Sequence, residues 1–473
     1  MQSIPISADF ESRLRELLTR SIEIEPAVKQ IADLSGIPYL VGGAVRDLLL
    51  QKPVHDLDIE VHHLTLDQVS DILSTQGPVS YVGKSFGVLK LHGSLVDWSL
   101  PRTDTSGRKP VVKLDPSMGI IEALKRRDLT INAMAINLIT YELIDPFHGF
   151  DDLQKGILRS PDIIFFCEDP LRFYRVMSFI GRFGFYPDAQ LQTLCKKMDI
   201  SDVSVERIEY EFEKLLLKSK RPSLGIRWLV VINRLGDILP ELVRTEQTQQ
   251  NPRWHPEGNV FEHLMQTLDA ATMLERGADF DNLILRYAAL CHDLGKVDTT
   301  VLVKGVLKSP GHAEAGVPYA KSLLKRLTRN TRLIAAVASL VKYHMSPSQF
   351  ISLGAKLAAF KRLALKLAPQ TNLEMLAYLS LADRRGRNSQ SSEPLKLTPQ
   401  FFKKFLEKAE RARSLREPEK PLLLGRDIND LVEPGPEMGH LLRYAYELQI
   451  ESLIKNKEEL RKKVIEKLSQ QKI

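Results

Sequence analysis

Strand-forming sequence is confined to one stretch of this chain, residues 37–145, and this asymmetry limits the folds that the chain can adopt. Short apolar runs alternate there with glycine and proline, as at 39–41 (YLV), 57–61 (LDIEV) and 87–91 (GVLKL), a pattern typical of strands joined by turns. Outside this stretch apolar residues recur at helical spacing, and residues 9–33 are typical of an amphipathic helix. The sequence therefore predicts one α/β or α+β domain, which contains the strands, followed by helical domains.

Two polar segments divide the helical sequence. Residues 247–256 (QTQQNPRWHP) are polar and contain proline, and residues 386–394 (GRNSQSSEP) are rich in serine, so both are predicted to be linkers. With these boundaries we expect five parts: an N-terminal helix (1–34), the strand-containing domain (35–150), a first helical domain (151–246), a second helical domain (255–388) and a helical tail (395–473).

The composition excludes several classes of protein. Lysine and arginine number 66 and aspartate and glutamate 59, a net charge of +7 that permits an anionic partner without requiring one. The three cysteines lie far apart, with no CxxC pair, which argues against a disulfide framework and a thiolate zinc site. No apolar run reaches about 18 residues, and the first residues lack the apolar core of a signal peptide. We therefore expect a cytoplasmic protein without a membrane span.

A pair of glycines, Gly42 and Gly43, joins a short apolar run to a helix predicted to begin near Ala44. Glycine lets the backbone approach a ligand closely, and a helix N-terminus presents free N–H groups to a phosphate. Arg46 follows in the first turn of this helix. The same residues also fit a simple tight turn between a strand and a helix, so this segment alone does not decide between the two interpretations.

Three acids share one face of the strand predicted at 55–61 (HDLDIEV). Alternation places Asp56, Asp58 and Glu60 on that face, with the backbones of the two aspartates roughly 7 Å apart. Such carboxylates can converge on Mg²⁺, a hard cation that prefers oxygen ligands, and two ions ~3.5–4 Å apart can clamp the attacking and leaving oxygens of a phosphoryl transfer. Asp97, in the neighbouring segment 94–100 (SLVDWSL), is a candidate third carboxylate. A solvated strand face is the alternative interpretation.

The motif GGAVRD followed closely by HDLDIEV is similar to the head-domain signature of the class II nucleotidyltransferases, which are the bacterial CCA-adding tRNA nucleotidyltransferases and their relatives, the bacterial poly(A) polymerases. Four later segments resemble further motifs of this family in the same order: KRRDLTINAMA (125–135), LIDPFHGFDDLQKGILR (143–159), EDPLRFYRVMSFIGRFGF (168–185) and VERIEYEFEKLL (205–216). The resemblance implies an α+β fold, with a small mixed-sheet nucleotidyltransferase head domain followed by an all-α neck, body, HD domain and tail.

The resemblance also implies roles for individual residues. Asp56 and Asp58 would bind Mg²⁺, with Asp97 as a third catalytic carboxylate. Asp169 and Arg172 would read the Watson–Crick edge of C or A without a nucleic-acid template; Asp169 with Pro170 also suits the start of a helix. The other nucleotide-binding residues would be Gly43, Arg46, Arg127, Asn132 and Arg175.

A second constellation lies between residues 254 and 386. Its order, His263, then His292-Asp293, then Asp383, resembles that of the HD-domain metal phosphohydrolases. The resemblance implies that these four residues bind a metal ion. Two further candidate ligands are His312 and His344, whereas His255 is not assigned as a ligand.

The residues themselves support this metal site only in part. His344 continues an apolar series at helical spacing, and a polar side chain on a buried face needs a partner such as a metal ion. Adjacent helix residues such as His292 and Asp293 diverge, so spacing alone does not pair them. Imidazole and carboxylate ligands suit Ni²⁺, Co²⁺, Mn²⁺, iron or zinc, and the choice among them stays open.

Together the two resemblances predict a template-independent tRNA nucleotidyltransferase that adds or repairs the 3′-terminal CCA from CTP and ATP. The HD domain implies a phosphohydrolase activity on 2′,3′-cyclic phosphates or 2′-phosphates. The expected partners are CTP, ATP and the acceptor stem and 3′ end of tRNA. Two alternatives stay open: a poly(A) polymerase or an enzyme that adds only CC or only A, and an HD phosphohydrolase whose head domain only binds RNA.

Overall fold

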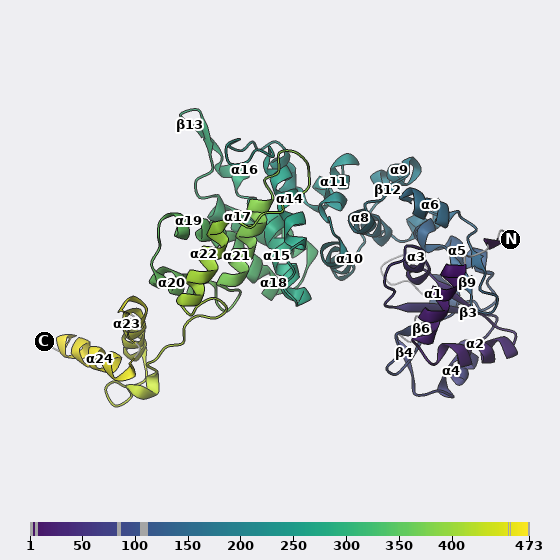
Figure 1. Cartoon of the computed structure of the whole chain (residues 1–473), viewed down its shortest axis with the longest axis horizontal. Helices are drawn as coiled ribbons and strands as arrows, with labels where there is room; N and C mark the ends of the chain where they lie inside the picture. Colours follow the sequence, from purple (N-terminus) through teal and green to yellow (C-terminus); the bar gives the residue numbers. More distant parts are fainter. Residues whose placement is uncertain are drawn as a thin grey trace. The chain divides into compact units, whose positions relative to one another are not determined.

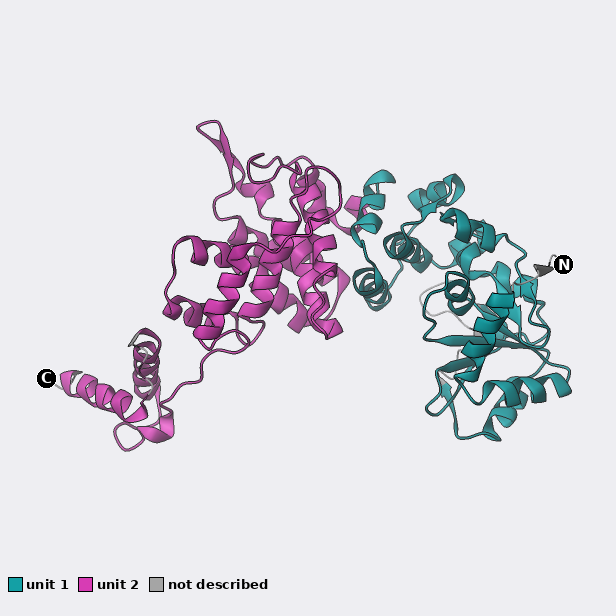
Figure 2. Ribbon diagram, viewed as in Figure 1, with its two compact units in different colours: residues 1–234 teal, residues 235–473 magenta. Residues whose placement is uncertain are grey.

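The chain forms two compact units, residues 1–234 and residues 235–473 (Figure 2). The computed structural model describes residues 3–4, 8–82, 87–104, 112–452, 454 and 456–471. Each unit buries its own set of large apolar side chains. Over the described residues, no helix combines the length and the apolar character that crossing a membrane requires.

A mixed sheet forms the centre of the first unit (Figure 1). Its described strands number eight, in the order β1-β10-β9-β2-β3-β6-β5-β4. Neighbouring strands run antiparallel except β3 and β6, which are parallel. The strands are β1 (Ser3–Ile4), β2 (Ile37–Val41), β3 (Leu57–His62), β4 (Val79–Val82), β5 (Val88–Leu91), β6 (Val96–Ser99), β9 (Ala135–Asn137) and β10 (Leu143–Ile144). The α+β fold class is therefore confirmed.

The register between β3 and β6 explains how two acids become neighbours. Asp58 pairs with Asp97 and Ile59 pairs with Trp98. Ile59 and Trp98 are completely buried, so side-chain alternation places the two aspartates together on the opposite face of the sheet. Burial of the apolar face thus fixes the position of the acidic one.

Helices surround this sheet and continue beyond it. Those of the first unit are α1 (Ala8–Thr19), α2 (Ile24–Asp33), α3 (Gly43–Leu49), α4 (Leu66–Ser74), α5 (Ile120–Lys125), α6 (Gly149–Lys155), α7 (Ile163–Glu168), α8 (Leu171–Phe183), α9 (Ala189–Lys197), α10 (Val205–Lys218) and α11 (Ser223–Val231), with a 3-10 turn η1 (Thr130–Asn132). Two small two-stranded sheets join β7 (Arg102–Asp104) to β8 (Val112–Leu114) and β11 (Ile157–Leu158) to β12 (Tyr186–Pro187).

The amphipathic segment 9–33 forms two helices where the sequence pattern indicated one. Pro26 lies in the first turn of α2, where a missing N–H costs little. In the interior of a single continuous helix, the same proline would remove a hydrogen bond and clash with the carbonyl of residue 22. The chain therefore breaks between Thr19 and Ile24.

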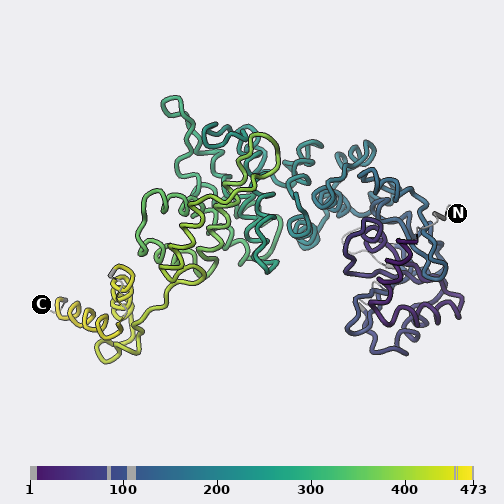
Figure 3. The backbone as a smooth tube through the Cα atoms, viewed as in Figure 1, coloured from purple at the N-terminus to yellow at the C-terminus, as the bar shows by residue number. Residues whose placement is uncertain are grey.

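The second unit is almost entirely helical. Its helices are α12 (Leu235–Ile238), α13 (Pro240–Val243), α14 (Val260–Thr272), α15 (Asp279–Cys291), α16 (Lys296–Thr299), α17 (His312–Leu327), α18 (Thr331–Tyr343), α19 (Ser346–Ser352), α20 (Leu357–Leu367), α21 (Leu373–Arg385), α22 (Gln400–Arg411), α23 (Pro436–Ser452) and α24 (Lys457–Gln471). A hairpin pairs β13 (Val301–Val303) with β14 (Val306–Lys308). In the tail, α23 and α24 lie side by side (Figure 3). They pack around a small apolar cluster that includes Leu441 and Val464.

The segment 247–256, which its composition predicted to be a linker, instead packs within the second unit. Gln250 is buried, its Nε2 donates to the carbonyl of Asn259 (3.1 Å), and its Oε1 accepts from Lys296 Nζ (2.7 Å). The division between the units falls earlier, between Arg234 and Leu235. Gln250, one of the polar residues that suggested a linker, is therefore a partner of buried groups.

Candidate functional site

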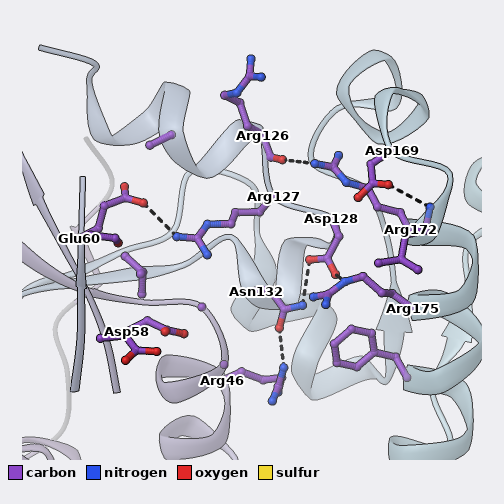
Figure 4. Close-up of a pocket in the computed structure, with 18 of the residues that line it drawn as sticks. Arg46, Asp58, Glu60, Arg126, Arg127, Asp128, Asn132, Asp169, Arg172 and Arg175 are labelled. Carbon is purple, nitrogen blue, oxygen red and sulfur yellow. Dashed lines mark hydrogen bonds and ion pairs between the residues drawn. The ribbon is translucent and has the colours of Figure 1, made fainter. Parts of the chain in front are cut away.

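A cavity of about 630 Å³ opens in the first unit between the sheet and the helices α8 and α10 (Figure 4). Nearly all of the predicted site residues of this unit line it: Gly43, Arg46, Asp58, Asp97, Arg127, Asn132, Asp169, Arg172 and Arg175. Figure 4 shows the acids of the sheet on one side and Asp169 and Arg172 on the opposite side. The cavity thus brings together residues that lie more than 130 positions apart in the chain.

The acids of the sheet form the floor of this cavity. Burial raises the pKa of Asp58, and the negative charges of Asp97 and Asp56 oppose the lowering effect of Arg127. Asp97 Oδ1 lies 2.8 Å from Lys90 Nζ. Asp56, which precedes β3 and is exposed, is not among the described residues that line the cavity. Two of the three predicted carboxylates therefore face the cavity directly.

The third acid of the strand, Glu60, positions an arginine. Its Oε2 accepts from Arg127 Nη2 (3.1 Å) and its Oε1 lies 3.1 Å from His62 Nε2. Burial raises the pKa of Glu60, but the hydrogen bond from His62 and the charge of Arg127 lower it overall. A Cβ at Gly42, where φ is +70°, would lie 3.4 Å from Arg127 Nη1 and 3.9 Å from Asp58 Oδ2. The glycine thus keeps the backbone of the turn close to both side chains.

A buried hydrogen-bond chain supports the centre of the cavity. Asp128 accepts from Asn132 Nδ2 (3.0 Å) through Oδ1 and from Arg175 Nε (2.6 Å) through Oδ2. Burial alone would raise the pKa of Asp128, but the charge of Arg175 and these hydrogen bonds lower it to about 2. Asn132 in turn accepts from Arg46 Nη1 (2.6 Å), whose other nitrogens donate to Asp47 (2.9 Å). The chain connects α3, η1 and α8 across the cavity.

The two predicted base-reading residues are held by partners that the sequence did not indicate. Both oxygens of Asp169 accept from Arg207 Nη2 (2.9 and 2.8 Å), and Oδ1 also accepts from the backbone N–H of Leu171 (3.1 Å). Arg172 donates to the carbonyls of Phe165 and Arg126, both at 2.6 Å. Helix α8 begins at Leu171, one residue later than expected, and Pro170 is its N-cap. Arg207 lies in the segment 205–216, which resembles a family motif but to whose residues the resemblance assigns no role here.

A cluster of residues that could hold a metal ion occurs in the second unit. His263 Nε2 lies 3.2 Å from His292 Nε2, 3.5 Å from Asp293 Oδ2 and 3.2 Å from Asp383 Oδ1. All four predicted ligands are therefore brought together, from α14, the end of α15 and α21. His292 is the C-cap of α15 and Asp293 follows the helix, so the two do not diverge as neighbours within a helix would.

The hydrogen bonds of this centre leave its ligand atoms pointing inward. His292 Nδ1 lies 2.9 Å from the carbonyl of Ala289, and His263 Nδ1 lies 3.1 Å from the carbonyl of Gly386. A carbonyl accepts only from an N–H, so Nδ1 carries a hydrogen in both rings, and Nε2 is the atom that faces the other predicted ligands. Burial raises the pKa values of Asp293 and Asp383, but Lys296 beside Asp293 and Arg387 beside Asp383 bring both pKa values well below the usual range. Such a donor set fits a divalent cation.

Further polar residues around this centre were not predicted. Glu257 Oε1 lies 2.7 Å from His263 Nδ1 and 2.9 Å from His255 Nδ1. Lys296 Nζ lies 2.6 Å from Asp293 Oδ2 and 3.2 Å from His255 Nε2. His255, which was not assigned as a ligand, thus contacts residues that hold the ligands. Glu257 follows the exposed Trp254 by three residues, and no sequence pattern there indicates a role at the metal centre. Only the folded chain brings its carboxylate to His263.

Comparison with known proteins adds independent information. Residues 38–159 match the poly A polymerase head domain, and residues 260–385 match the HD domain. The chain is similar to the multifunctional CCA proteins of Mannheimia succiniciproducens (33% identical; 74% of this chain, 84% of that protein) and Pasteurella multocida (34% identical; the same shares).

Solved structures have the same fold at lower identity. The Bacillus stearothermophilus CCA-adding enzyme in complex with CTP aligns with a TM-score of 0.64 at 21% identity, covering 94% of this chain and 97% of that one. The Thermotoga maritima CCA-adding enzyme complexed with tRNA aligns with a TM-score of 0.55 at 20% identity, covering 93% and 94%. With an identity above 30% to relatives of which it covers most of the length, the chain belongs to the family of the multifunctional CCA proteins.

Proposed function

We propose that this protein is a template-independent tRNA nucleotidyltransferase that adds or repairs the 3′-terminal CCA from CTP and ATP. The observation that carries the proposal is the cavity itself: adjacent carboxylates on the sheet face an aspartate and an arginine on α8. Its relatives bear the name of this activity. In this proposal residues 35–150 are the nucleotidyltransferase head, residues 151–246 recognise nucleotide and RNA, and the protein works in the cytoplasm, where tRNA and nucleoside triphosphates occur.

The acids of the sheet fit Mg²⁺. The raised pKa of Asp58 is that of a partly buried carboxylate beside two other negative charges, which a divalent cation would offset. Asp58 and Asp97 would hold the metal, with Asp56 as a further ligand, and when bound it would neutralise charge on the phosphates of the nucleotide. Arg127, oriented by Glu60, supplies fixed N–H groups for phosphate oxygens. Catalysis by this chain is then mainly positioning of the two reactants.

Base selection follows from the chemistry of Asp169 and Arg172. Cytosine and adenine each present an exocyclic amino group beside a ring nitrogen that carries a lone pair, so a carboxylate can accept from the first while a guanidinium donates to the second. Uracil and guanine present the opposite arrangement, with a carbonyl beside a ring N–H. The pair therefore accepts C and A and rejects U and G through the same two side chains.

The test uses tRNA lacking CCA, with CTP, ATP and Mg²⁺. Addition of CC followed by A supports the proposal. Addition of A tracts to any RNA, or of only CC or only A, would favour the alternative activities of the same chemistry, and no addition would overturn the proposal. We expect Asp58→Ala to abolish addition, whereas Asp67→Ala, at an exposed acid in the first turn of α4, leaves it unchanged.

We further propose that the second unit is a metal-dependent phosphohydrolase that acts on 2′,3′-cyclic phosphates or 2′-phosphates of RNA ends. Four converging ligands support it, and Ni²⁺, Co²⁺ and Mn²⁺ are the candidate ions. The metal-loaded protein should hydrolyse these esters, and His292→Ala should remove hydrolysis while CCA addition continues. Absence of turnover by the metal-loaded protein, under conditions where addition proceeds, would contradict this second activity.

A further inference from the structure

An exposed tryptophan lies beside the proposed metal centre of the second unit. Trp254 is 52% exposed, whereas the other two tryptophans of the chain, Trp98 and Trp228, are buried in the first unit. The next residue, His255, has its ring centroid 4.7 Å from that of His263, a predicted metal ligand. Tryptophan is highly buried on average, so an indole that stays in solvent at the edge of this centre is a candidate for ligand binding.

The backbone that carries Trp254 is held in place at its carbonyl and at both flanks. Arg387 donates through Nη1 to the carbonyl of Trp254 (3.2 Å) and through Nη2 to Asp383 Oδ1 (2.7 Å). One guanidinium therefore connects this carbonyl to a predicted metal ligand. Pro252 and Pro256 flank the segment, and each fixes its own φ. The chain thus holds the backbone firmly beside the centre while the indole remains in solvent.

Arg253 adds a positive charge to the same surface. Its guanidinium carbon lies 5.2 Å from the centroid of the Trp254 ring, a cation–π contact. The nearest acid in the sequence, Glu257, has a completely buried side chain that pairs with His255 and His263. Among the residues that the structure describes, no carboxylate pairs with Arg253. An indole and a guanidinium therefore lie together in solvent, and the guanidinium is available to an anion.

These two side chains suit an unstacked base of RNA and a neighbouring phosphate. The bases of a single strand stack on aromatic side chains, and arginine offers phosphate oxygens a fixed set of N–H groups. A protein partner needs more surface, because a specific interface covers about 800 Å² on each partner. Trp254 stands between Arg253 and His255 in the chain and so belongs to no apolar run. The chemistry of the surface therefore favours RNA over a protein.

We propose that Trp254 and Arg253 hold a base of a single-stranded RNA end while its terminal phosphate lies at the metal centre. The inference rests on the proposed phosphohydrolase function and specifies its substrate, which is an RNA end with an unpaired base and not any small phosphate ester. Trp254 is then a positioning residue, because it holds the nucleotide without touching the reacting phosphate. Loss of the indole should weaken substrate binding and leave turnover of the bound substrate unchanged.

The first test uses the metal-loaded, full-length protein and two substrates: a dinucleotide that ends in a 2′,3′-cyclic phosphate, and the same backbone without bases. We expect Trp254→Ala to raise the KM of the first substrate roughly tenfold, the effect of losing one base–aromatic contact. Neither kcat nor the KM of the base-free substrate should change. Trp254→Phe keeps an aromatic face and should have a KM near that of the wild type. The matched control, Leu353→Ala, removes an exposed apolar side chain elsewhere in the second unit and should change nothing.

Arg253→Gln separates the two halves of the site. Both substrates keep the phosphate that joins their two sugars, so this variant should raise the KM of both. A rise confined to the base-containing substrate would contradict a phosphate contact by Arg253.

The second test measures binding without hydrolysis, in protein from which metals have been removed by chelation. The base-containing dinucleotide should quench the emission of Trp254, and Trp254→Phe should lack this quenching, because the remaining tryptophans are buried in the first unit. If the wild type hydrolyses neither substrate, the proposed hydrolase fails, and quenching by the base-containing dinucleotide alone still supports the base site. Equal KM values for the wild type and Trp254→Ala, or equal quenching by both dinucleotides, would overturn the inference. Self-association that Trp254→Ala abolishes, with RNA binding unchanged, would overturn it in favour of a contact between two copies.

Discussion

Replacement of Asp128 by asparagine tests whether the buried chain beneath the cavity stabilises the first unit. The pKa of this carboxyl falls from 3.8 to about 2 in the folded protein, because the charge of Arg175 and the hydrogen bonds from Asn132 and Arg175 together outweigh the cost of burial. At about 1.4 kcal/mol for each tenfold change in proton affinity, this difference corresponds to about 2 kcal/mol of stability. The uncharged amide would also leave Arg175 facing a poorer acceptor, so we expect a loss of about 2–4 kcal/mol at neutral pH.

The assay follows urea unfolding of the full chain by tryptophan fluorescence. Trp98 and Trp228 are buried in the first unit, and Trp254, in the second, is changed to phenylalanine in every variant so that emission reports the first unit alone. The matched control is Asp151→Asn. It removes the charge of an exposed acid of α6 whose Oδ2 lies 3.7 Å from Lys155 Nζ. Such a surface pair contributes about 0–1 kcal/mol.

The pH dependence of this effect has a definite sign. The folded pKa of Asp128 lies below its unfolded value, so its contribution is complete above pH 3.8 and disappears as the pH falls through about 2. The difference between the wild type and Asp128→Asn should therefore narrow below pH 4. If Asp128→Asn and Asp151→Asn shift the urea midpoint equally at pH 7, the carboxylate of Asp128 does not stabilise the first unit beyond an ordinary surface acid.

Two further substitutions address residues that hold other functional groups. Arg207→Gln should raise misincorporation of UTP relative to CTP by roughly tenfold (~1.4 kcal/mol, the order of one displaced contact to a base). The reason is that Asp169 loses the guanidinium that fixes the plane of its carboxylate. Single-turnover assays with each nucleotide measure the ratio of the two rates, and an unchanged ratio would contradict this role of Arg207. Glu257→Gln should weaken metal binding in the second unit by roughly 10–100-fold, as loss of a ligand's supporting carboxylate usually does. The reason is that Glu257 accepts a hydrogen bond from the predicted ligand His263. Competition with a chelator measures the metal affinity, and an affinity equal to that of the wild type would contradict this role of Glu257.

The fold and the main groups of the site were predictable for a common reason: each left a local pattern. Alternation in β3 placed Asp58 and Glu60 on one face, and the structure confirms that both line the cavity. Arg172 and Arg175 are three positions apart in α8, a spacing that puts two side chains on one face of a helix, and both line the cavity as well. Periodicity works here because one face of each element is buried against a core.

The residues that hold the predicted site residues in place could not be predicted from a spacing of this kind. Arg207 is separated from Asp169 by 38 positions, and Glu257 approaches His263 only because an irregular segment folds against α14. A polar residue of an irregular segment can face solvent or a buried partner, and tertiary contacts decide between the two. The spacing of apolar residues in the sequence does not indicate those contacts. The same limit made residues 247–256 resemble a linker, although Gln250 in that segment binds Lys296.

The partners of Asp169 and Arg172 leave room for a base. A carboxylate offers about four lone-pair positions and a guanidinium five N–H groups. Arg207 and the backbone N–H of Leu171 account for three contacts on Asp169, two of them on Oδ1, so a position remains on Oδ2 for one amino group. Arg172 donates two N–H groups to carbonyls and retains others. A base could therefore form hydrogen bonds to both side chains without breaking any of these contacts. Arg207 and the N–H of Leu171 would also make base binding selective, because they prevent the carboxylate of Asp169 from rotating to accept the ring N–H of uracil or guanine.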